Sequence, residues 1–314
     1  MLPPSRPSGR PAALRSPQRL GQIALGVIWC VDALLKTQSY FFHNFAMGVI
    51  DASAAGQPKL LGDPITFIGN HIVAPHQATF TVFVVLVEFS IGACLITSRF
   101  VKPALLISFA WALGVWYTGE GLGFIFTSTT PSPLTGIIAT SPLYVIAGLL
   151  VWPRDSGAQL GLLGERGARL VWAALWLGAA VLWLFPSNAG ANALHDAFAG
   201  APSGTGWLAS VESTAANAVA GSGVALAIAL ALASAAIGLA VLWGRGTRVA
   251  LYGAIVISLV FWVLAEGLGA LFTGAATDIG TGPLMVLIAS QLLVLAPRRA
   301  TAVNRPQVQT ASLA

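Results

Sequence analysis

Two short stretches of the sequence place the same acid beside an apolar run. GEGLGFIFT occupies residues 119 to 127, AEGLGALFT occupies residues 265 to 273, and the shared acids are Glu120 and Glu266. Carboxylates in an apolar setting are costly unless they face protein or water, so the two acids are candidates for a substrate or proton site. If the fold brings them together, their like charges raise one pKa and make the pair a proton acceptor. The alternative is that each glutamate caps its own turn by accepting hydrogen bonds from backbone or threonine groups.

The two stretches also repeat glycines and a threonine after the acid. The shared glycines are Gly121, Gly123, Gly267 and Gly269, and the shared threonines are Thr127 and Thr273. Glycine weakens a helix and allows another backbone or a ligand to approach closely, so we expect unwinding that exposes carbonyl groups to a small ion or solute. Beyond the threonines the stretches differ, STTPSPLTG against GAATDIGTG, and the second contains Asp278. Any pathway is therefore expected to be asymmetric.

The helix that follows each stretch also has a predicted start. Thr135 and Thr281 are expected as N-caps, with Pro283 at a position where its missing N–H costs little. The N-terminus of a helix carries partial positive charge, so it attracts an anion or holds a glutamate from the preceding loop.

Three other ionisable residues fall within or beside apolar runs. Glu88 lies about halfway along its run, and a mid-membrane glutamate is a functional candidate by default, although a protonated Glu88 hydrogen-bonded within the bundle is the alternative. Asp32 lies one turn before Lys36, which predicts a structural i,i+4 ion pair.

Histidine and cysteine give no sign of a metal or redox centre. The histidines lie in or beside polar segments with no metal-ligand spacing, so no metal site is predicted. They are His43, His71, His76 and His195. Cys30 and Cys94 are expected at different depths, which argues against a disulfide, because bridged Cα atoms lie within about 7 Å of each other.

The amino-acid composition indicates whether the segments that carry these residues lie in water or in a membrane. With 56% hydrophobic and 9% charged residues in 314, the chain is far from a soluble domain, which has roughly 25% charged residues. A spanning helix needs about 20 apolar residues, and eight segments qualify, which predicts an all-α polytopic membrane protein. They are residues 19 to 36, 77 to 98, 101 to 123, 135 to 152, 168 to 186, 222 to 243, 247 to 272 and 282 to 296.

The chain also contains an internal duplication. A shift of 146 residues aligns Arg99 with Arg245 and Trp116 with Trp262, together with the two acids and their glycines. Two four-helix units are predicted, residues 19 to 153 and 168 to 297, with a cytoplasmic linker at 154 to 167 and disordered cytoplasmic tails at 1 to 18 and 298 to 314. Because four is even, both units begin on the same side, so the repeats are parallel and their interface is the default place for a site. Long external excursions are expected at residues 37 to 76 and 187 to 221.

The basic residues predict the orientation of these helices. All but Lys36 and Lys59 of the 16 lysines and arginines fall on one side of the eight-helix arrangement. Cytoplasmic loops retain Lys and Arg, so both termini are predicted in the cytoplasm and the protein in the plasma (inner) membrane. The basic residues are scattered over several segments, and no nucleic-acid partner is expected.

Four local patterns resemble those of a known family. PQRL opens the first helix, AAGQP occupies residues 54 to 58, SRFVK forms a basic turn, and GEGLG…FT leads to TG. In this layout residues 17 to 298 resemble the DoxX/DoxD-like membrane proteins, most of all actinobacterial members with two fused four-helix units. That family includes the small membrane subunit of a thiosulfate:quinone oxidoreductase, and other members are linked to thiol or oxidative-stress complexes. The resemblance implies a quinone-facing or sulfur-linked role and supplies no established catalytic residue.

Three functions follow as hypotheses. The first is a membrane subunit of a redox assembly, with quinone or a small sulfur compound bound between the repeats and the glutamates taking up protons. The second is a transporter of a small solute or a proton-coupled transporter, because parallel repeats meet at glycine-broken helix ends. The third is a non-catalytic scaffold for an envelope complex, with the first excursion as the docking surface for protein partners.

Overall fold

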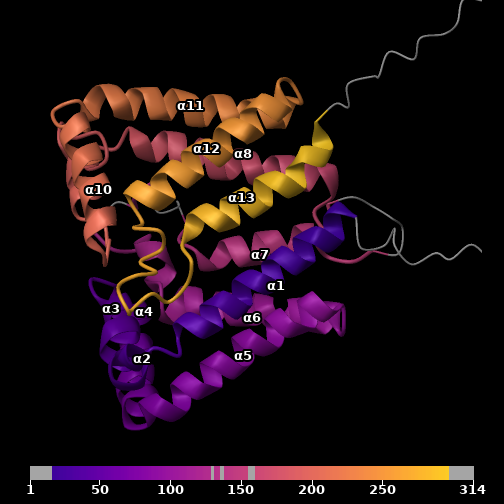
Figure 1. Ribbon diagram of the computed structural model, residues 1–314, viewed down its shortest axis with the longest axis vertical. Coiled ribbons are helices and arrows are strands. Elements are labelled where there is room, and N and C mark those ends of the chain that lie inside the picture. The colour runs from indigo at the N-terminus through magenta and orange to yellow at the C-terminus, as the bar shows by residue number, and fades with distance from the viewer. Residues whose placement is uncertain (1–15, 129–130, 135–137, 155–159, 297–314) are drawn as a thin grey trace, which may run out of the picture.

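The computed structural model describes residues 16 to 128, 131 to 134, 138 to 154 and 160 to 296, and the regular structure of these residues is helical, with no strand. One set of helices runs side by side, while α2 (Ser39–Phe45), α3 (Ala52–Ala54), α4 (Lys59–Phe67) and α10 (Gly206–Val219) lie at the end of this bundle away from the start of α1 (Figure 1). The helices of the bundle are α1 (Pro17–Leu35), α5 (Gln77–Thr97), α6 (Val101–Thr118), α7 (Ser141–Leu150), α8 (Gly164–Trp183), α11 (Gly223–Trp243), α12 (Thr247–Leu264) and α13 (Thr281–Leu292).

Five of the described helices are long and apolar enough to cross a membrane. They are Pro17–Leu35, Lys59–Thr97, Val101–Thr118, Gly223–Trp243 and Thr247–Leu264. Two further apolar helices, Ser141–Leu150 and Thr281–Leu295, are shorter. The outward sides of the long helices carry large apolar residues, for example Leu106 at 58% and Leu232 at 67% exposure. Together with the composition, this surface identifies a helical membrane protein.

The helices recur at the spacing found in the sequence. Both α5 and α11 have 21 residues, both α6 and α12 have 18, and each pair begins 146 positions apart. Helix α1 packs against α5 as α8 packs against α11, and α6 packs against α7 as α12 packs against α13. Helix α13 contacts both α7 and α1, so the first and second halves of the chain meet along these helices.

One arginine in each half ties the first long helix to the second. Arg19 on α1 donates to the carbonyl oxygen of Leu95 at 2.6 Å, and Arg169 on α8 donates to that of Val241. These carbonyls belong to the last turns of α5 and α11, where helical carbonyls have no intrahelical partner and cations are favoured. Arg19 and Arg169 therefore cap neighbouring helices.

Small residues bring α1 and α5 into close contact. A Cβ atom placed on Gly92 would lie 2.6 Å from the carbonyl oxygen of Gly26 and 2.5 Å from Sγ of Cys30. Only glycine allows this separation, as in other membrane helix pairs with small residues at the crossing. The crossing brings the C-terminal half of α1 close to the middle of α5.

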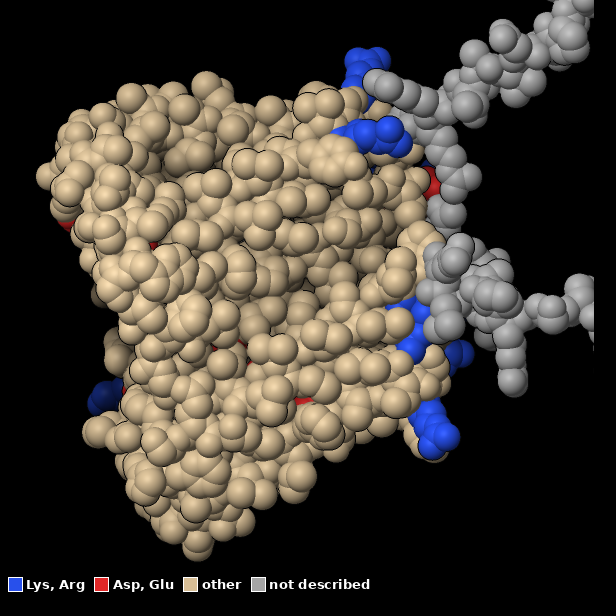
Figure 2. All heavy atoms as spheres, in the orientation of Figure 1, with Lys and Arg blue, Asp and Glu red and all other residues tan. Residues whose placement is uncertain are grey.

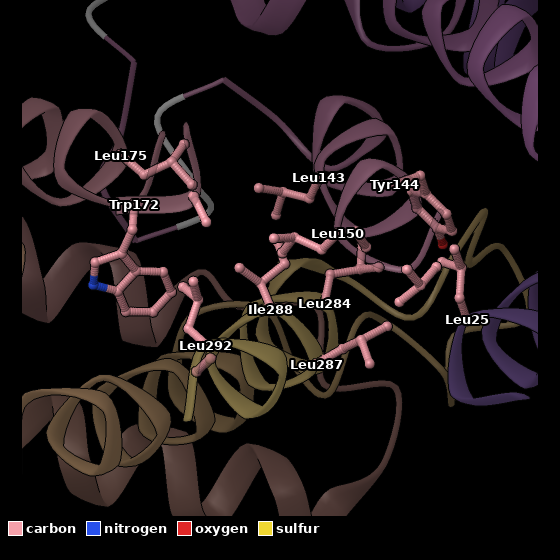
Figure 3. Packing of buried hydrophobic residues seen from close by; sticks show 14 of the residues in the cluster. Leu25, Leu143, Tyr144, Leu150, Trp172, Leu175, Leu284, Leu287, Ile288 and Leu292 are labelled. Carbon is pink, nitrogen blue, oxygen red and sulfur yellow. The ribbon is translucent and has the colours of Figure 1, made fainter. Parts of the chain in front are cut away.

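The apolar core lies where the two halves meet. Figure 3 shows side chains from α1, α7, α8 and α13 that point toward one another, among them Leu25, Tyr144, Trp172 and Leu284. These four residues are at most 3% exposed. The core fixes α7 of the first half against α13 of the second half. It thereby positions the loops that lead into these two helices.

Charged residues gather at one end of the molecule. Figure 2 shows Lys and Arg concentrated at the end where the termini lie, whereas the sides of the helices on the face drawn are almost completely uncharged. The few acidic side chains visible between the helices are mostly covered by apolar neighbours. The charges that remain inside the bundle therefore define the candidate site.

Candidate functional site

Each repeated acid stands between a helix and a left-handed turn. The φ angles of residues 121 to 124 are 52°, 54°, 66° and 55°, and those of residues 267 to 270 are 54°, 58°, 71° and 57°. Left-handed backbone costs roughly 1–2 kcal/mol for each non-glycine residue, so glycine at two of the four positions limits the cost. The predicted helices at 101 to 123 and 247 to 272 are therefore too long, because α6 ends at Thr118 and α12 at Leu264.

The first glycine of each turn packs directly on backbone of the segment that joins the first two long helices of its half. A Cβ atom on Gly121 would lie 2.4 Å from the carbonyl oxygen of Ser53, and one on Gly267 would lie 2.4 Å from that of Pro202. The predicted close approach of another group therefore occurs in both halves, and the approaching group is backbone. The glycines hold each excursion against the helix bundle.

Each repeated glutamate caps the helix that follows its turn. Both carboxylate oxygens of Glu120 accept from the backbone N–H of Ser141, at 3.1 and 3.0 Å, at the start of α7. Glu266 accepts from the N–H of Thr281 at 2.8 Å and from its hydroxyl, at the start of α13. A carboxylate in this position satisfies an unpaired N–H and lies at the positive end of the helix. The expectation that these helix N-termini hold a glutamate is confirmed.

The predicted N-cap residues differ from the observed ones. Thr281 is the first residue of α13, and Gly280 occupies the N-cap position with φ 83° and ψ 179°. The expectation for Thr281 is therefore wrong, because the capping oxygens come from Glu266 instead. Thr135 lies outside the described residues. The residue of the first half that matches Thr281 in its contacts is Ser141.

Both acids follow the ends of candidate membrane helices, and the pKa of each carboxyl group is raised above its ordinary value. Burial, together with the charge of Asp278, raises the pKa of Glu120 to about 8 against the opposing effect of the hydrogen bonds from Ser141. Burial also raises the pKa of Glu266 to about 7, opposed by the hydrogen bonds from Thr281. At neutral pH Glu120 therefore holds its proton, while Glu266 is close to half-ionised.

The repeated threonines belong to the turns. The hydroxyl of Thr127 donates to the carbonyl oxygen of Phe124 at 2.8 Å, and that of Thr273 donates to the carbonyl oxygen of Ala270 at 2.8 Å. Each bond joins a hydroxyl to a carbonyl three residues earlier, at the end of the left-handed turn. These contacts give the duplicated threonines a structural role.

A buried ion pair joins α1 to α5. Lys36 Nζ lies 2.9 Å from Glu88 Oε2, and the two side chains are 8% and 2% exposed. Lys36 also donates to the carbonyl oxygen of Thr277, and Trp111 Nε1 donates to the other oxygen of Glu88 at 3.2 Å. The predicted ion pair between Asp32 and Lys36 is therefore wrong. The close crossing of α1 and α5 gives Lys36 a partner on the neighbouring helix.

Asp32 on α1 instead binds α7 of the first half and the loop before α13 of the second half. It is buried, accepts from the hydroxyl of Tyr144 on α7, and accepts from the backbone N–H of Ile279 at 3.2 Å. The carboxylate of Asp278 accepts from Gly280 N–H at 2.8 Å and from the Thr277 hydroxyl at 2.9 Å. The loop before α13 is thus held against the first half.

These charged groups line a cavity of about 220 Å³, which we name the charged cavity. Apolar and aromatic walls come from the external π-helix Ala46–Asp51 and from α5 and α6, and include Ile50, Phe80, Val84, Trp111 and Val115. The polar lining consists of Asp32, Lys36, Glu88, Glu120, Ser141, Tyr144, Thr277 and Asp278 together with Thr118. Four carboxylates and one amine thus border a space whose remaining walls are apolar, which is the composition of a site for a small amphipathic ligand.

A smaller cavity of about 70 Å³ lies among α8, α11, α12 and α13 of the second half and is closed by Pro133, Leu134, Ile138 and Leu143 of the first. Its polar lining consists of hydroxyl groups, those of Ser234, Ser258 and Thr281, and none of the described residues that line it is charged. Ser234 stands 146 positions after Glu88, so the ion pair of the first half has no counterpart there. Glu120 lines the charged cavity, whereas Glu266 lines neither of these two cavities.

The structure thus brings three of the candidate residues near one another and leaves the others in or beside the turns. Glu88, Glu120 and Asp278 line the charged cavity, and Lys36 and Tyr144 join them although neither was proposed as a site residue. Lysine among apolar residues was a usable signal, because an unpaired buried amine requires a carboxylate partner. Tyr144 carried no such signal in its own segment. Among the described residues, no group of three or more His, Cys, Asp or Glu side chains is placed to hold a metal ion.

Comparison with known proteins identifies no relative. No family model matches the chain, and neither a curated protein nor a solved structure matches it. The function is therefore inferred from the residues and geometry of this chain.

Proposed function

We propose that this chain is an integral membrane subunit of a redox-linked complex, of DoxX/DoxD-like type, whose charged cavity binds a quinone head group or a small sulfur compound. The proposal is carried by one observation, an aromatic-walled cavity of about 220 Å³ bordered by buried proton donors and acceptors. A redox protein of the same membrane, or another envelope protein, is the expected partner.

The proposal includes a topology. Eight segments cross the plasma membrane as two parallel four-helix repeats, and both termini lie in the cytoplasm. The matched lengths and spacing of α5 with α11 and of α6 with α12 support two equivalent units. The concentration of Lys and Arg at the end where the termini lie supports the orientation (Figure 2).

The cavity offers the groups that a quinone head requires. Quinone oxygens accept hydrogen bonds, and the Lys36 ammonium on the cavity wall has three N–H donors, of which Glu88 and the Thr277 carbonyl take two and one is left for a ligand. The ring of Trp111 and that of Phe80 provide apolar surface for a flat ring. Glu120 holds a proton at neutral pH on the same wall, in the position of a general acid.

The test measures binding of a short-chain ubiquinone analogue to the purified protein in detergent by equilibrium dialysis. Tyr144→Phe keeps the ring and leaves the Asp32 carboxylate on the cavity wall without its hydroxyl partner, so it should weaken binding of a head group that accepts hydrogen bonds by about tenfold. Ser258→Ala removes a hydroxyl from the smaller cavity and should leave the affinity unchanged. Copurification of a redox protein with the wild-type chain would add support.

Two results would overturn the proposal. In the first, the wild-type protein retains no more quinone than empty detergent micelles and copurifies with no redox protein. In the second, Ser258→Ala weakens binding as much as Tyr144→Phe, which would place the quinone elsewhere.

The excess of carboxylates favours a second candidate, a proton-coupled transporter of a small solute. Four carboxylates and one lysine line the charged cavity, and Glu120 exchanges its proton near physiological pH. Uptake into proteoliposomes driven by a pH gradient should fall with Glu120→Gln and persist with Glu266→Gln. Equal uptake by both variants and the wild type would remove this candidate.

A further inference from the structure

The charged cavity has its mouth on the side of α6. Of the residues that line it, Ala110 and Gly114 are exposed, and the others are buried or half-buried. The two are four positions apart, so they lie one above the other on one face of the helix. A Cβ atom placed on Gly114 would meet no atom within 4 Å. The opening is therefore framed by small side chains and leads to the outside of the bundle.

The residues around this opening are those of a lipid-facing surface. Leu106, Ile107 and Leu113 are 58%, 54% and 49% exposed, and α6 is apolar enough to cross a membrane. Large exposed apolar residues on such a helix face acyl chains. The mouth of the cavity therefore opens sideways, toward the interior of a bilayer.

A groove on the surface of the bundle lies along α5 and α6, one turn from the opening. It has a volume of about 350 Å³ and is lined by apolar residues of α5 and α6, including Phe83, Leu86, Pro103 and Ile107. Pro103 and Ile107 share the helix face of the opening, since positions 103, 107, 110 and 114 follow the spacing of one helical stripe. An apolar chain in this groove would place its end at the mouth of the cavity.

One tryptophan stands between the groove and the cavity. The ring of Trp111 packs on Phe83, a residue of the groove, with centroids 5.8 Å apart. Its Nε1 donates to Glu88 at 3.2 Å, inside the charged cavity. The side chain of Trp111 therefore contacts the groove on one side and the charged cavity on the other.

The second half lacks this opening. At the offset of 146, Val256 and Val260 replace Ala110 and Gly114, and both valines are exposed, at 59% and 43%. Neither valine lines the smaller cavity of that half. Larger side chains therefore coincide with a cavity that is smaller and uncharged.

We propose that Ala110 and Gly114 form a lateral portal through which an amphiphile dissolved in the bilayer, with a small polar head and an apolar tail, reaches the charged cavity. The head lies among the polar groups of the cavity and the tail in the groove between α5 and α6. This inference rests on the proposed function for the presence of a ligand, and it names the class of that ligand, a membrane-dissolved amphiphile.

The test measures access to the cavity with a reporter thiol and needs no ligand. Val84 lines the cavity and is 2% exposed, so Val84→Cys, with Cys30→Ala and Cys94→Ala, places one thiol inside. The protein is reconstituted in vesicles and treated with a long-chain N-alkyl maleimide or with a charged, membrane-impermeant thiosulfonate. The maleimide should label the thiol, and the charged reagent should label it at least about tenfold more slowly, because it does not enter lipid.

Plugging the portal should then block the maleimide. Gly114→Leu adds a side chain where space is open, so it should slow labelling by about tenfold or more, and Ala110→Leu should act in the same way. Gly253 on α12 also has no atom within 4 Å of an added Cβ, so Gly253→Leu is the matched control and should leave the rate unchanged. Unaltered labelling of both plugged variants would overturn the portal, as would equal rates for the two reagents.

This outcome is separable from that of the proposed function. Lateral labelling that is blocked by Gly114→Leu supports the portal even if the quinone analogue fails to bind. Quinone binding that survives both plugged variants, with labelling also unchanged, supports the cavity as a binding site and removes the portal.

Discussion

Replacing Glu120 with glutamine should remove a pH dependence of stability that has a defined direction. The pKa of Glu120 is about 8 in the folded protein, against an ordinary value of 4.5. Between these values the folded protein holds a proton that the unfolded chain releases, so the free energy of unfolding falls as pH rises. Glutamine stays neutral and keeps an oxygen for the Ser141 N–H, so it should retain the cap and abolish this dependence.

The magnitude follows from the two pKa values. One pKa unit corresponds to about 1.4 kcal/mol, so between about pH 5.5 and pH 8 Glu120 should lower the free energy of unfolding by about 3 kcal/mol. Glu266, with its pKa of about 7, should lower it by about 2 kcal/mol over the same interval. At about 2–4 °C for each kcal/mol, the contribution of Glu120 to the shift in Tm is about 6–12 °C.

The assay is thermal unfolding in detergent across this pH interval, followed by intrinsic fluorescence and repeated for the wild type, Glu120→Gln and Glu266→Gln. The wild-type Tm should fall most steeply, and Glu120→Gln should flatten the curve more than Glu266→Gln. A Glu120→Gln curve parallel to that of the wild type would refute the reasoning, because it would mean that Glu120 is ionised and hydrated in the folded protein.

Two further predictions concern the contacts that position the cavity, and both are checked by thermal unfolding near neutral pH. Lys36→Met should destabilise the protein by about 3–5 kcal/mol, because it leaves Glu88 buried without its partner, and adding Glu88→Gln should recover part of the loss. No recovery would show that Lys36 acts independently of Glu88. Gly92→Ala should cost about 1–3 kcal/mol by forcing α1 from α5, more than the control Gly238→Ala, whose added Cβ meets its nearest atom at 3.3 Å. Equal costs would contradict the close crossing.

Part of this structure could be predicted because hydropathy and spacing are local signals. Apolar runs predicted the long helices, and the 146-residue offset predicted that α5 and α6 would recur as α11 and α12. The glycines predicted a break after each acid. They did not predict its hand, because Leu122 and Phe124 also adopt positive φ, which non-glycine residues rarely do.

The partner of Lys36 could not be predicted from spacing. The i,i+4 rule favours Asp32, and it holds on helix surfaces where no other acid competes. Inside the bundle the choice depends on which helices cross, and the crossing of α1 and α5 brings Glu88 to Lys36 across 52 positions of sequence. Tyr144 then satisfies Asp32 from α7. Such contacts follow from tertiary packing, and no single segment contains the information.

The glutamate occurs in both halves because it caps a helix in each. The chemical groups around it differ between the halves. In both halves the glutamate reaches across a left-handed turn to cap the next helix, which accounts for its presence twice without any shared site. The surroundings then differ, because Glu120 lines a cavity with Lys36, Glu88 and Asp278, whereas the second half has hydroxyl groups and valines at the matching places. The cap and the helix packing that the halves share need the glutamate but not the pair of Lys36 and Glu88, so the fold recurs in the second half although the ion pair does not. The charged cavity, to which both halves contribute residues, is therefore the place in which an activity is to be sought.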